Sequence, residues 1–235
     1  MFCLVGNLLI LLIASAEFSN ANEDYDILLF SQQWPITTCF QKGKDLRECN
    51  IRNYAWSIHG IWPTEDFPGT YPKDCNNHSP LNVRNLKGIH RQLENKWYNI
   101  LIKNVEHFWS WEWKKHGTCS MNLQALNSQY KYFYQGLEWS KNYEIGSILN
   151  RSRIIMGDYY YYREIQTALK NHLNVTTQII CHKEDDGWVQ LLYEVRICIN
   201  KRLQLIDCDG HVYETNCNKA LSIKYPNLKQ RRMST

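Results

Sequence analysis

Apolar residues follow two different spacings along this chain, and each spacing predicts one kind of element. The segments 26–35, DILLFSQQWP, and 53–63, NYAWSIHGIWP, are apolar runs that both end at a proline. Runs of this length and composition are typical of buried strands. From 189 to 199, apolar positions alternate with polar residues that include Glu194 and Arg196. A period of two predicts a third strand there.

Three segments in the middle of the chain show helical spacing instead. Their apolar residues recur at steps of three and four, which predicts helices with one buried face. These residues are Leu86, Ile89, Leu93, Trp97 and Ile100; Leu123, Leu126, Tyr130, Phe133 and Leu137; and Ile165, Leu169 and Leu173. Strands at both ends with helices between them predict an α+β fold, in which several α-helices flank an antiparallel β-sheet core.

The composition is that of one globular domain. The chain has 235 residues, of which 44% are hydrophobic and 21% charged. That is too apolar for a disordered chain and long enough for a single sizeable core. The net charge of +4 permits a polyanionic partner but does not argue for one, because surfaces that bind nucleic acids usually cluster their basic residues.

Both ends of the chain differ from the rest. Residues 1–21 resemble a secretory signal peptide, with cleavage after Ala16 or Ala21, and its apolar run LLILLIA is too short for a membrane span. Residues 218–235 are predicted to form a basic C-terminal tail. We therefore expect an exported protein with one folded domain at 22–217.

Cysteine usage agrees with export. Cys3 lies in the signal segment, and the eight remaining cysteines are an even number, which favours disulfides over free thiols. Their spacing alone does not choose a pairing. Three sequons for N-linked glycosylation, at Asn77, Asn150 and Asn174, also fit a secreted glycoprotein. We expect it to be extracellular and to reach lysosomes or endosomes after uptake.

The first cluster with candidate chemistry is 108–120, FWSWEWKKHGTCS. Glu112, Lys115 and His116 stand at i, i+3 and i+4, so they share one face of a helix that Gly117 is expected to end. A carboxylate, an ammonium and an imidazole on one face can form an acid–base group. A solvated charged face remains an open alternative, as does a metal site, for which no third ligand is evident.

The second cluster is 57–63, SIHGIWP, where His59 is expected at the end of a strand, beside a glycine. Taken alone, it is more often structural. Two histidines, a lysine and a glutamate together are what RNA cleavage by internal transfer requires. One group takes the 2′-hydroxyl proton, another protonates the leaving 5′-oxygen, and a cation offsets the charge on phosphorus. We expect no metal and no cofactor, since the nucleophile is already in the substrate.

The two clusters resemble the active-site segments of the ribonuclease T2 family, whose patterns are H-G-L-W-P and F-W-x-H-E-W-x-K-H-G-T-C. The resemblance covers residues 26–217 and includes FSQQWP, ALNSQYKYF and the C-terminal cysteines, which are similar to the animal members. It implies the fold of that family. It also implies a secreted, metal-independent endoribonuclease that cleaves single-stranded RNA through a 2′,3′-cyclic phosphate.

The resemblance also implies roles for individual residues. His116 would be the base and His59 the acid of transesterification, while Glu112 and Lys115 would stabilise the phosphorane. Trp62 corresponds to an aromatic residue that stacks on a base. The implied disulfides are Cys39–Cys49, Cys75–Cys119, Cys181–Cys217 and Cys198–Cys208.

Two residues depart from the family pattern. Trp111 stands where the family has a histidine that is thought to help hold the phosphate. We expect Trp111 to contact substrate, and its presence bears on rate and affinity rather than on reaction class. Thr64 replaces an aspartate that often reads the base, so no base preference carries over. Gln33 stands where some members line a second base site, and we expect it to bind substrate.

Two alternatives come from other classes of function. The chain is alternatively a secreted glycoprotein effector that acts on host or partner cells after glycan-dependent uptake through a cell-surface glycan receptor. In that case its ribonuclease activity would be weak or absent because of Trp111. A zinc hydrolase that uses Glu112 and His116 is the weaker rival. In each case we expect a monomer.

Overall fold

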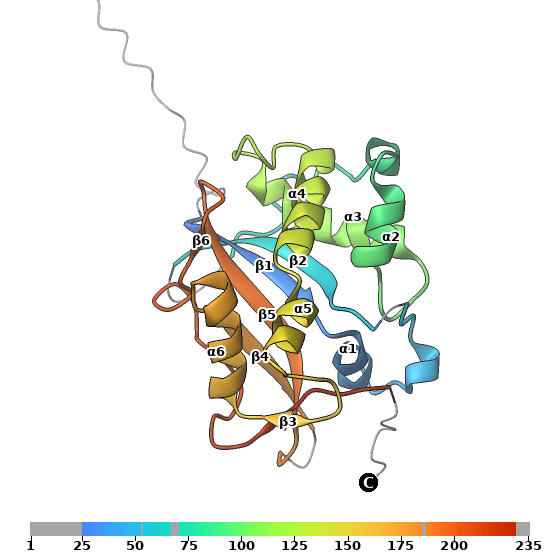
Figure 1. Ribbon diagram of the computed structural model, residues 1–235. Coiled ribbons are helices and arrows are strands. Elements are labelled where there is room, and N and C mark those ends of the chain that lie inside the picture. Colours follow the sequence, from blue (N-terminus) through green and yellow to red (C-terminus); the bar gives the residue numbers. More distant parts are fainter. Residues whose placement is uncertain (1–24, 53, 67–70, 185–186, 229–235) are drawn as a thin grey trace, which may run out of the picture.

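The computed structural model describes residues 25–52, 54–66, 71–184 and 187–228, so the expected signal peptide lies outside it. Within these residues, seven strands form one sheet (Figure 1). The strands are β1 (Ile27–Gln33), β2 (Ser57–Thr64), β3 (Tyr159–Tyr160), β4 (Gln178–Lys183), β5 (Gln190–Asn200), β6 (Leu205–Ile206) and β7 (Ile223–Lys224). The α-helices are α1 (Pro35–Gln41), α2 (His90–Lys96), α3 (Val105–Lys115), α4 (Gln129–Asn142), α5 (Ile145–Arg151) and α6 (Tyr162–Leu173). Short 3-10 helices span Leu46–Glu48, Val83–Leu86 and Gly117–Ser120.

The long strand β5 is the centre of the sheet. It pairs with β1 along one side and with β4 and β6 along the other, and β2 forms the edge beyond β1. These pairings are antiparallel, whereas a two-residue contact between β5 and β7 is parallel. The predicted α+β fold with an antiparallel core is thereby confirmed.

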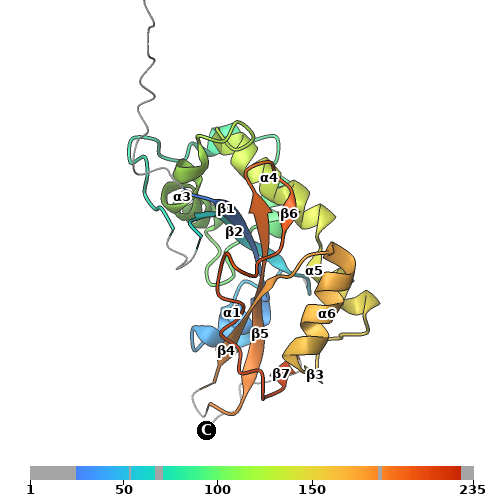
Figure 2. The same cartoon turned by 90° about the vertical axis from the view of Figure 1, so that its left-hand side faces the viewer.

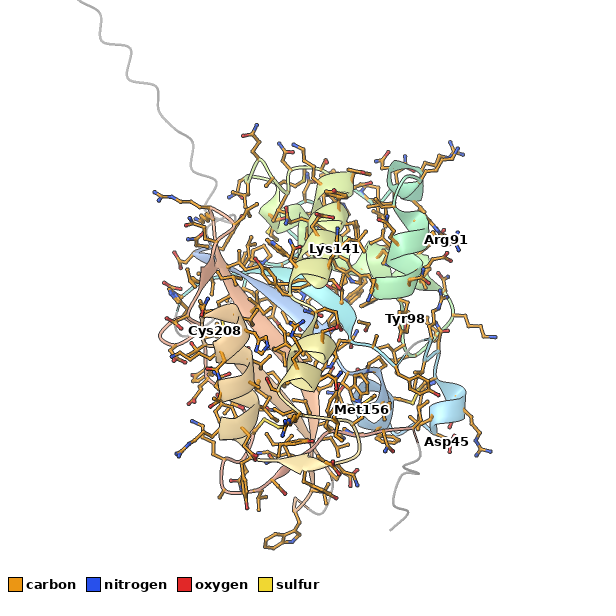
Figure 3. The ribbon with its side chains drawn as sticks, viewed as in Figure 1. Asp45, Arg91, Tyr98, Lys141, Met156 and Cys208 are labelled. Atoms are coloured by element: carbon orange, nitrogen blue, oxygen red, sulfur yellow. A yellow bond between two sulfur atoms is a disulfide. The ribbon has the colours of Figure 1, made fainter. Side chains whose placement is uncertain are left out.

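Helices cover the sheet and hold an aromatic core. Figure 2 shows α4, α5 and α6 along one side of the sheet and α1 on the other, and side chains fill the layers between them (Figure 3). Trp97, Trp109, Trp113, Tyr132 and Phe133 are fully buried and pack together, with 4.9 Å between the ring centroids of Trp97 and Phe133. Burial of these large rings fixes α3 against α4.

Two of the predicted helices are shorter than their apolar spacing suggests. The pattern from 86 to 100 yields only α2, because Trp97 and Ile100 are buried from the loop that follows the helix. The pattern from 123 to 137 becomes helical only at Gln129, where Ser128 caps the helix by accepting a hydrogen bond from the Lys131 amide. Apolar spacing reports burial, and capping residues decide where a helix begins.

Residues 218–228 belong to the folded domain, which corrects the domain boundary expected at 217. β7 joins the sheet, and Ile223 and Tyr225 are buried. The Trp56 indole donates to the Tyr225 hydroxyl at 2.8 Å, and the Trp34 indole donates to the Pro226 carbonyl at 2.9 Å. Because the segment is rich in basic residues, the sequence did not indicate that Ile223 and Tyr225 are buried.

Disulfides tie the loops to this framework, and all four implied pairings are confirmed. They are Cys39–Cys49, Cys75–Cys119, Cys181–Cys217 and Cys198–Cys208. The second of them joins the loop that carries Tyr71 to the turn that follows α3. In the described part of the chain, no helix has both the length and the apolar character needed to cross a membrane.

Candidate active site

A β-bulge in the edge strand β2 positions His59. Ser31 of β1 pairs with Gly60 and Gln32 pairs with Ile58, so His59 is the extra residue with no partner across the ladder. In a regular strand, His59 and Trp62 would point to opposite faces, because they are three residues apart. The bulge places both side chains in the same pocket.

Buried side chains of the helical layer hold the bulge in place by hydrogen bonds to the free edge of β2. The Trp97 indole donates to the His59 carbonyl at 3.0 Å, and the Tyr132 hydroxyl donates to the Ile61 carbonyl at 2.9 Å. These bonds satisfy carbonyl groups that an edge strand otherwise leaves unpaired. Gly60 is required next to the bulge, since a Cβ atom there would lie 2.2 Å from the Glu112 carboxylate.

Helix α3 carries the second group of candidate residues. Trp109 and Trp113 are buried in the core, which turns Glu112, Lys115 and the cap residue His116 toward β2. The helix ends at Lys115, as the glycine at 117 predicted. The face that the spacing of Glu112, Lys115 and His116 predicted is therefore the one that lies toward β2.

The two elements enclose a pocket of about 390 Å³, a size usual for small-molecule sites. β2, α3, β5 and the loop before Cys75 all contribute to it. Its lining includes His59, Trp62, Tyr71, Trp111, Glu112, Lys115, His116 and Arg196. Every residue expected in catalysis is thus brought together in one cavity.

The aromatic residues of the pocket have different surroundings. Trp62 donates its indole N–H to Glu112 at 3.1 Å, and the guanidinium of Arg196 lies 4.9 Å from its ring centroid. Trp111 is 56% exposed. The Lys115 ammonium lies 5.9 Å from the centroid of the Trp111 ring and 5.8 Å from that of Tyr71. Trp111 and Tyr71 therefore offer aromatic surface at the mouth of the pocket.

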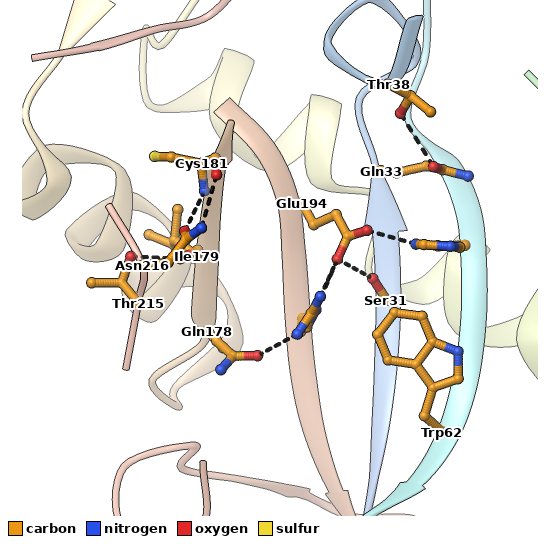
Figure 4. A network of polar contacts seen from close by, with 12 residues as sticks. Ser31, Gln33, Thr38, Trp62, Gln178, Ile179, Cys181, Glu194, Thr215 and Asn216 are labelled. Atoms are coloured by element: carbon orange, nitrogen blue, oxygen red, sulfur yellow. Dashed lines mark hydrogen bonds and ion pairs between the residues drawn. The ribbon is translucent and has the colours of Figure 1, made fainter. Parts of the chain in front are cut away.

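A buried polar network behind the pocket centres on Glu194 of β5, which is 1% exposed (Figure 4). Its Oε1 atom accepts a hydrogen bond from His59 Nδ1 at 2.6 Å. Its Oε2 atom accepts hydrogen bonds from Arg196 Nε at 2.8 Å and from the Ser31 hydroxyl at 3.3 Å, and it forms an ion pair with Arg196 Nη2 at 2.7 Å. Arg196 Nη1 donates to Gln178 Oε1 at 3.1 Å.

This network sets the protonation of His59. Burial by itself raises the pKa of Glu194, but Arg196 and His59 outweigh it and hold that pKa at about 2. Burial likewise lowers the pKa of His59, and the contact with the Glu194 carboxylate more than offsets this, so the pKa of His59 is raised. Because the carboxylate is ionised, His59 Nδ1 carries a proton and Nε2 is the nitrogen left for substrate.

His116 is held in the opposite state. Burial, the charge of Lys115 and the charge of His59 lower the pKa of His116 to about 3. Its Nδ1 atom is buried and has no hydrogen-bond partner among the described residues. Burial raises the pKa of Glu112 to about 7, against the opposing effects of His59, Trp62 and Lys115. The surroundings therefore favour the protonated form of His59 and the neutral form of His116.

Sequence reading missed Glu194 and misplaced Gln33. The alternation in 189–199 marked Glu194 and Arg196 as polar positions of a strand, but it could not show that they face the histidine of β2. Gln33 is buried in β1, accepts a hydrogen bond from Thr38 and does not line the pocket. Its side chain lies against α1, which corrects the expected contact with substrate.

The described residues contain no group of three or more His, Cys, Asp or Glu side chains arranged to hold a metal ion. Glu112 instead accepts the Trp62 indole N–H, and His59 is engaged with Glu194. The zinc alternative therefore lacks a ligand set in this part of the chain.

Comparison with known proteins gives one consistent family. Residues 25–208 match the ribonuclease T2 family. Ribonuclease Oy of Magallana gigas is 34% identical over 211 residues, which cover 87% of this chain and 97% of that protein. Extracellular ribonuclease LE of Solanum lycopersicum is 33% identical over 207 residues, covering 85% and 88%. Human RNase T2 superimposes with a TM-score of 0.72 at 28% identity, covering 86% of this chain and 98% of that one. The chain belongs to the ribonuclease T2 family and is a T2-type endoribonuclease.

Proposed function

We propose that this protein cleaves single-stranded RNA by transesterification through a 2′,3′-cyclic phosphate, with His116 as the base and His59 as the acid. The observation that carries the proposal is the placement of two histidines in one pocket, where their surroundings shift their pKa values in opposite directions. The pKa of His116 is lowered to about 3, and the pKa of His59 is raised. Above the lowered pKa of His116 and below the raised pKa of His59, His116 can take a proton while His59 can give one.

The first step uses both histidines at once. His116 removes the proton from the 2′-hydroxyl, and the 2′-oxygen then attacks phosphorus. The bond from phosphorus to the 5′-oxygen breaks, and His59 protonates that oxygen as it leaves. In the second step the roles exchange, because His59 activates a water molecule and His116 protonates the 2′-oxygen of the cyclic phosphate. Each histidine thereby returns to its starting state.

Glu112 and Lys115 would stabilise the phosphorane between the two histidines. Lys115 supplies a positive charge on the pocket wall next to His116. Glu112 is 3% exposed, and its pKa of about 7 makes it a group that can donate or accept a proton near neutrality. A protonated carboxyl group can donate a hydrogen bond to a phosphoryl oxygen, which is the electrostatic help that such a transition state needs.

We propose that the protein is exported and glycosylated. The sequon asparagines Asn77, Asn150 and Asn174 are all exposed, so each is accessible to a glycan. The four disulfides and the similarity to a relative named as extracellular support the same compartment. Glycan-dependent uptake by host or partner cells is compatible with this surface and is tested by comparing uptake before and after removal of the glycans.

The test of the catalytic proposal is cleavage of a single-stranded RNA by the purified mature protein in the presence of a chelator. Product ends are assayed for 2′,3′-cyclic phosphate, and an all-deoxy strand of the same sequence serves as the substrate control. We expect cyclic ends from the RNA and no cleavage of the deoxy strand, which lacks the nucleophile.

Variants of His59 and His116 assign the roles. His59→Phe and His116→Ala should each remove turnover with the fold intact, whereas His107→Ala on the exposed side of α3 should keep it. Full turnover in either site variant would overturn the assignment. A folded wild-type protein that cleaves no RNA between acidic and neutral pH would favour the effector alternative, in which Trp111 marks a disabled site.

A further inference from the structure

We propose that Arg196 is a substrate-binding residue that holds an RNA phosphate in the pocket that Lys115 also lines. Arg196 lines the cavity together with His59, Trp62 and His116, and its side chain is 24% exposed. It comes from β5, whereas Lys115 comes from the end of α3. This inference rests on the proposed RNA cleavage at the same site and adds the group that fixes the phosphate there.

The guanidinium of Arg196 is held rigidly before any ligand arrives. Glu194 accepts a hydrogen bond from its Nε atom and pairs with Nη2, and Gln178 accepts from Nη1. The Trp62 ring lies against it, with 4.9 Å from the guanidinium carbon to the ring centroid. Glu194, Gln178 and Trp62, which make these contacts, are labelled in Figure 4. An arginine fixed in this way loses little side-chain entropy when it binds a ligand.

This arrangement leaves donors for a ligand. A guanidinium carries five N–H groups. Hydrogen bonds to Glu194 and Gln178 engage one on Nε and one on Nη1, and Nη2 lies in the ion pair with Glu194. Nη1 and Nη2 each carry a further N–H group that makes no hydrogen bond with another described residue. The anionic part of RNA is its phosphate, whose oxygens accept strong hydrogen bonds from guanidinium N–H groups.

The charges of this network give the pocket a net positive charge. Glu194 contributes one negative charge, whereas Arg196 and protonated His59 contribute two positive charges at its two oxygens. The excess faces the cavity, because Glu194 itself is buried. The described residues that line the pocket include one lysine, Lys115, and one arginine, Arg196. A phosphodiester in the pocket can therefore meet one positive charge from α3 and one from β5.

Binding measurements with adenosine 3′-monophosphate and with adenosine test this inference without depending on turnover. Arg196→Gln should raise the dissociation constant of the nucleotide at least tenfold and leave that of the nucleoside unchanged. Arg196→Lys keeps a positive charge near Glu194 but loses the fork, so the nucleotide should be weakened less. Arg163→Gln, an exposed residue of α6 away from the pocket, is the matched control.

The outcomes separate this inference from the proposed function. Equal nucleotide affinity in wild type and in both Arg196 variants, with RNA cleavage still dependent on His59, would overturn the role of Arg196 alone. A lower cleavage rate with unchanged nucleotide affinity would also overturn it, because it would mean that Arg196 acts only through Glu194 and His59. Loss of affinity for the nucleotide in a protein that cleaves no RNA would keep the phosphate site and remove the proposed reaction.

Discussion

The contact between Glu194 and His59 can be tested by removing one charge and almost no volume. Glu194→Gln keeps the shape of the side chain, and its amide oxygen can still accept one of the two cationic neighbours. The variant loses the carboxylate that His59 Nδ1 and Arg196 share at 2.6 and 2.7 Å. His59 then no longer has the partner that keeps it protonated, so its pKa should fall.

The size of the effect follows from burial. Glu194 is 1% exposed, and breaking a buried ion pair by removing one partner costs about 3–5 kcal/mol. The lower end of this range applies because glutamine keeps a hydrogen bond, so we expect the free energy of unfolding to fall by about 3 kcal/mol. That corresponds to a fall in Tm of about 6–12 °C for a domain of this size. General acid catalysis typically contributes about 10²–10⁴-fold, and we expect kcat to fall about 100-fold.

Stability should depend on pH in a defined direction. The pKa of Glu194 is depressed from 4.5 to about 2. The ionised carboxylate therefore contributes to the free energy of unfolding above pH 4.5, and this contribution is lost as pH falls toward 2. The difference in unfolding free energy between wild type and variant, measured by urea denaturation, should therefore shrink over that range. A constant difference would contradict the depressed pKa.

The activity profile gives the second readout of Glu194→Gln. The alkaline limb of kcat/KM should move to lower pH, because His59 loses its proton earlier. Glu106→Gln, which changes an exposed carboxylate of α3, is the control and should leave both limbs in place. An unchanged alkaline limb in Glu194→Gln, together with wild-type kcat, would refute the role assigned to this carboxylate.

Three further predictions concern other parts of the structure. In the unmodified enzyme, kcat/KM should rise as pH passes about 3, where His116 becomes neutral, and should fall above 6.5, where His59 with its raised pKa loses its proton. Gly60→Ala should cost about 1–3 kcal/mol in urea denaturation and most of the cleavage rate, because the new Cβ meets the buried carboxylate of α3. Replacing Cys75 and Cys119 by alanine opens a loop of 44 residues, and calorimetry should show a loss of about 4 kcal/mol.

Sequence reading found the parts of the site whose spacing is local. The spacing of Glu112, Lys115 and His116 places them on one helix face whatever the rest of the fold is. The glycine that follows predicts where the helix ends. Glu194 could not be found in this way, because it lies 135 residues from His59 and meets it only across β1. Polar residues in an alternating strand usually face water, and this one is buried.

Tertiary context also decided the helix starts and the C-terminal boundary. The apolar residues of 123–126 suggested a helix that Ser128 delays, and the basic character of 218–228 hid a strand. In the first case a capping residue determines where the helix begins. In the second case pairing with distant strands determines that the segment joins the sheet.

The bulge at His59 has a consequence for how this protein can change over time. Deleting that one residue would restore a regular ladder, because Ile58 would still pair with Gln32 and Gly60 with Ser31, so the remaining side chains of β2 would keep their faces of the sheet. Loss of a single codon would then remove the acid while leaving the sheet and every other functional residue in place. The function of this strand therefore rests on one residue that the sheet itself does not need.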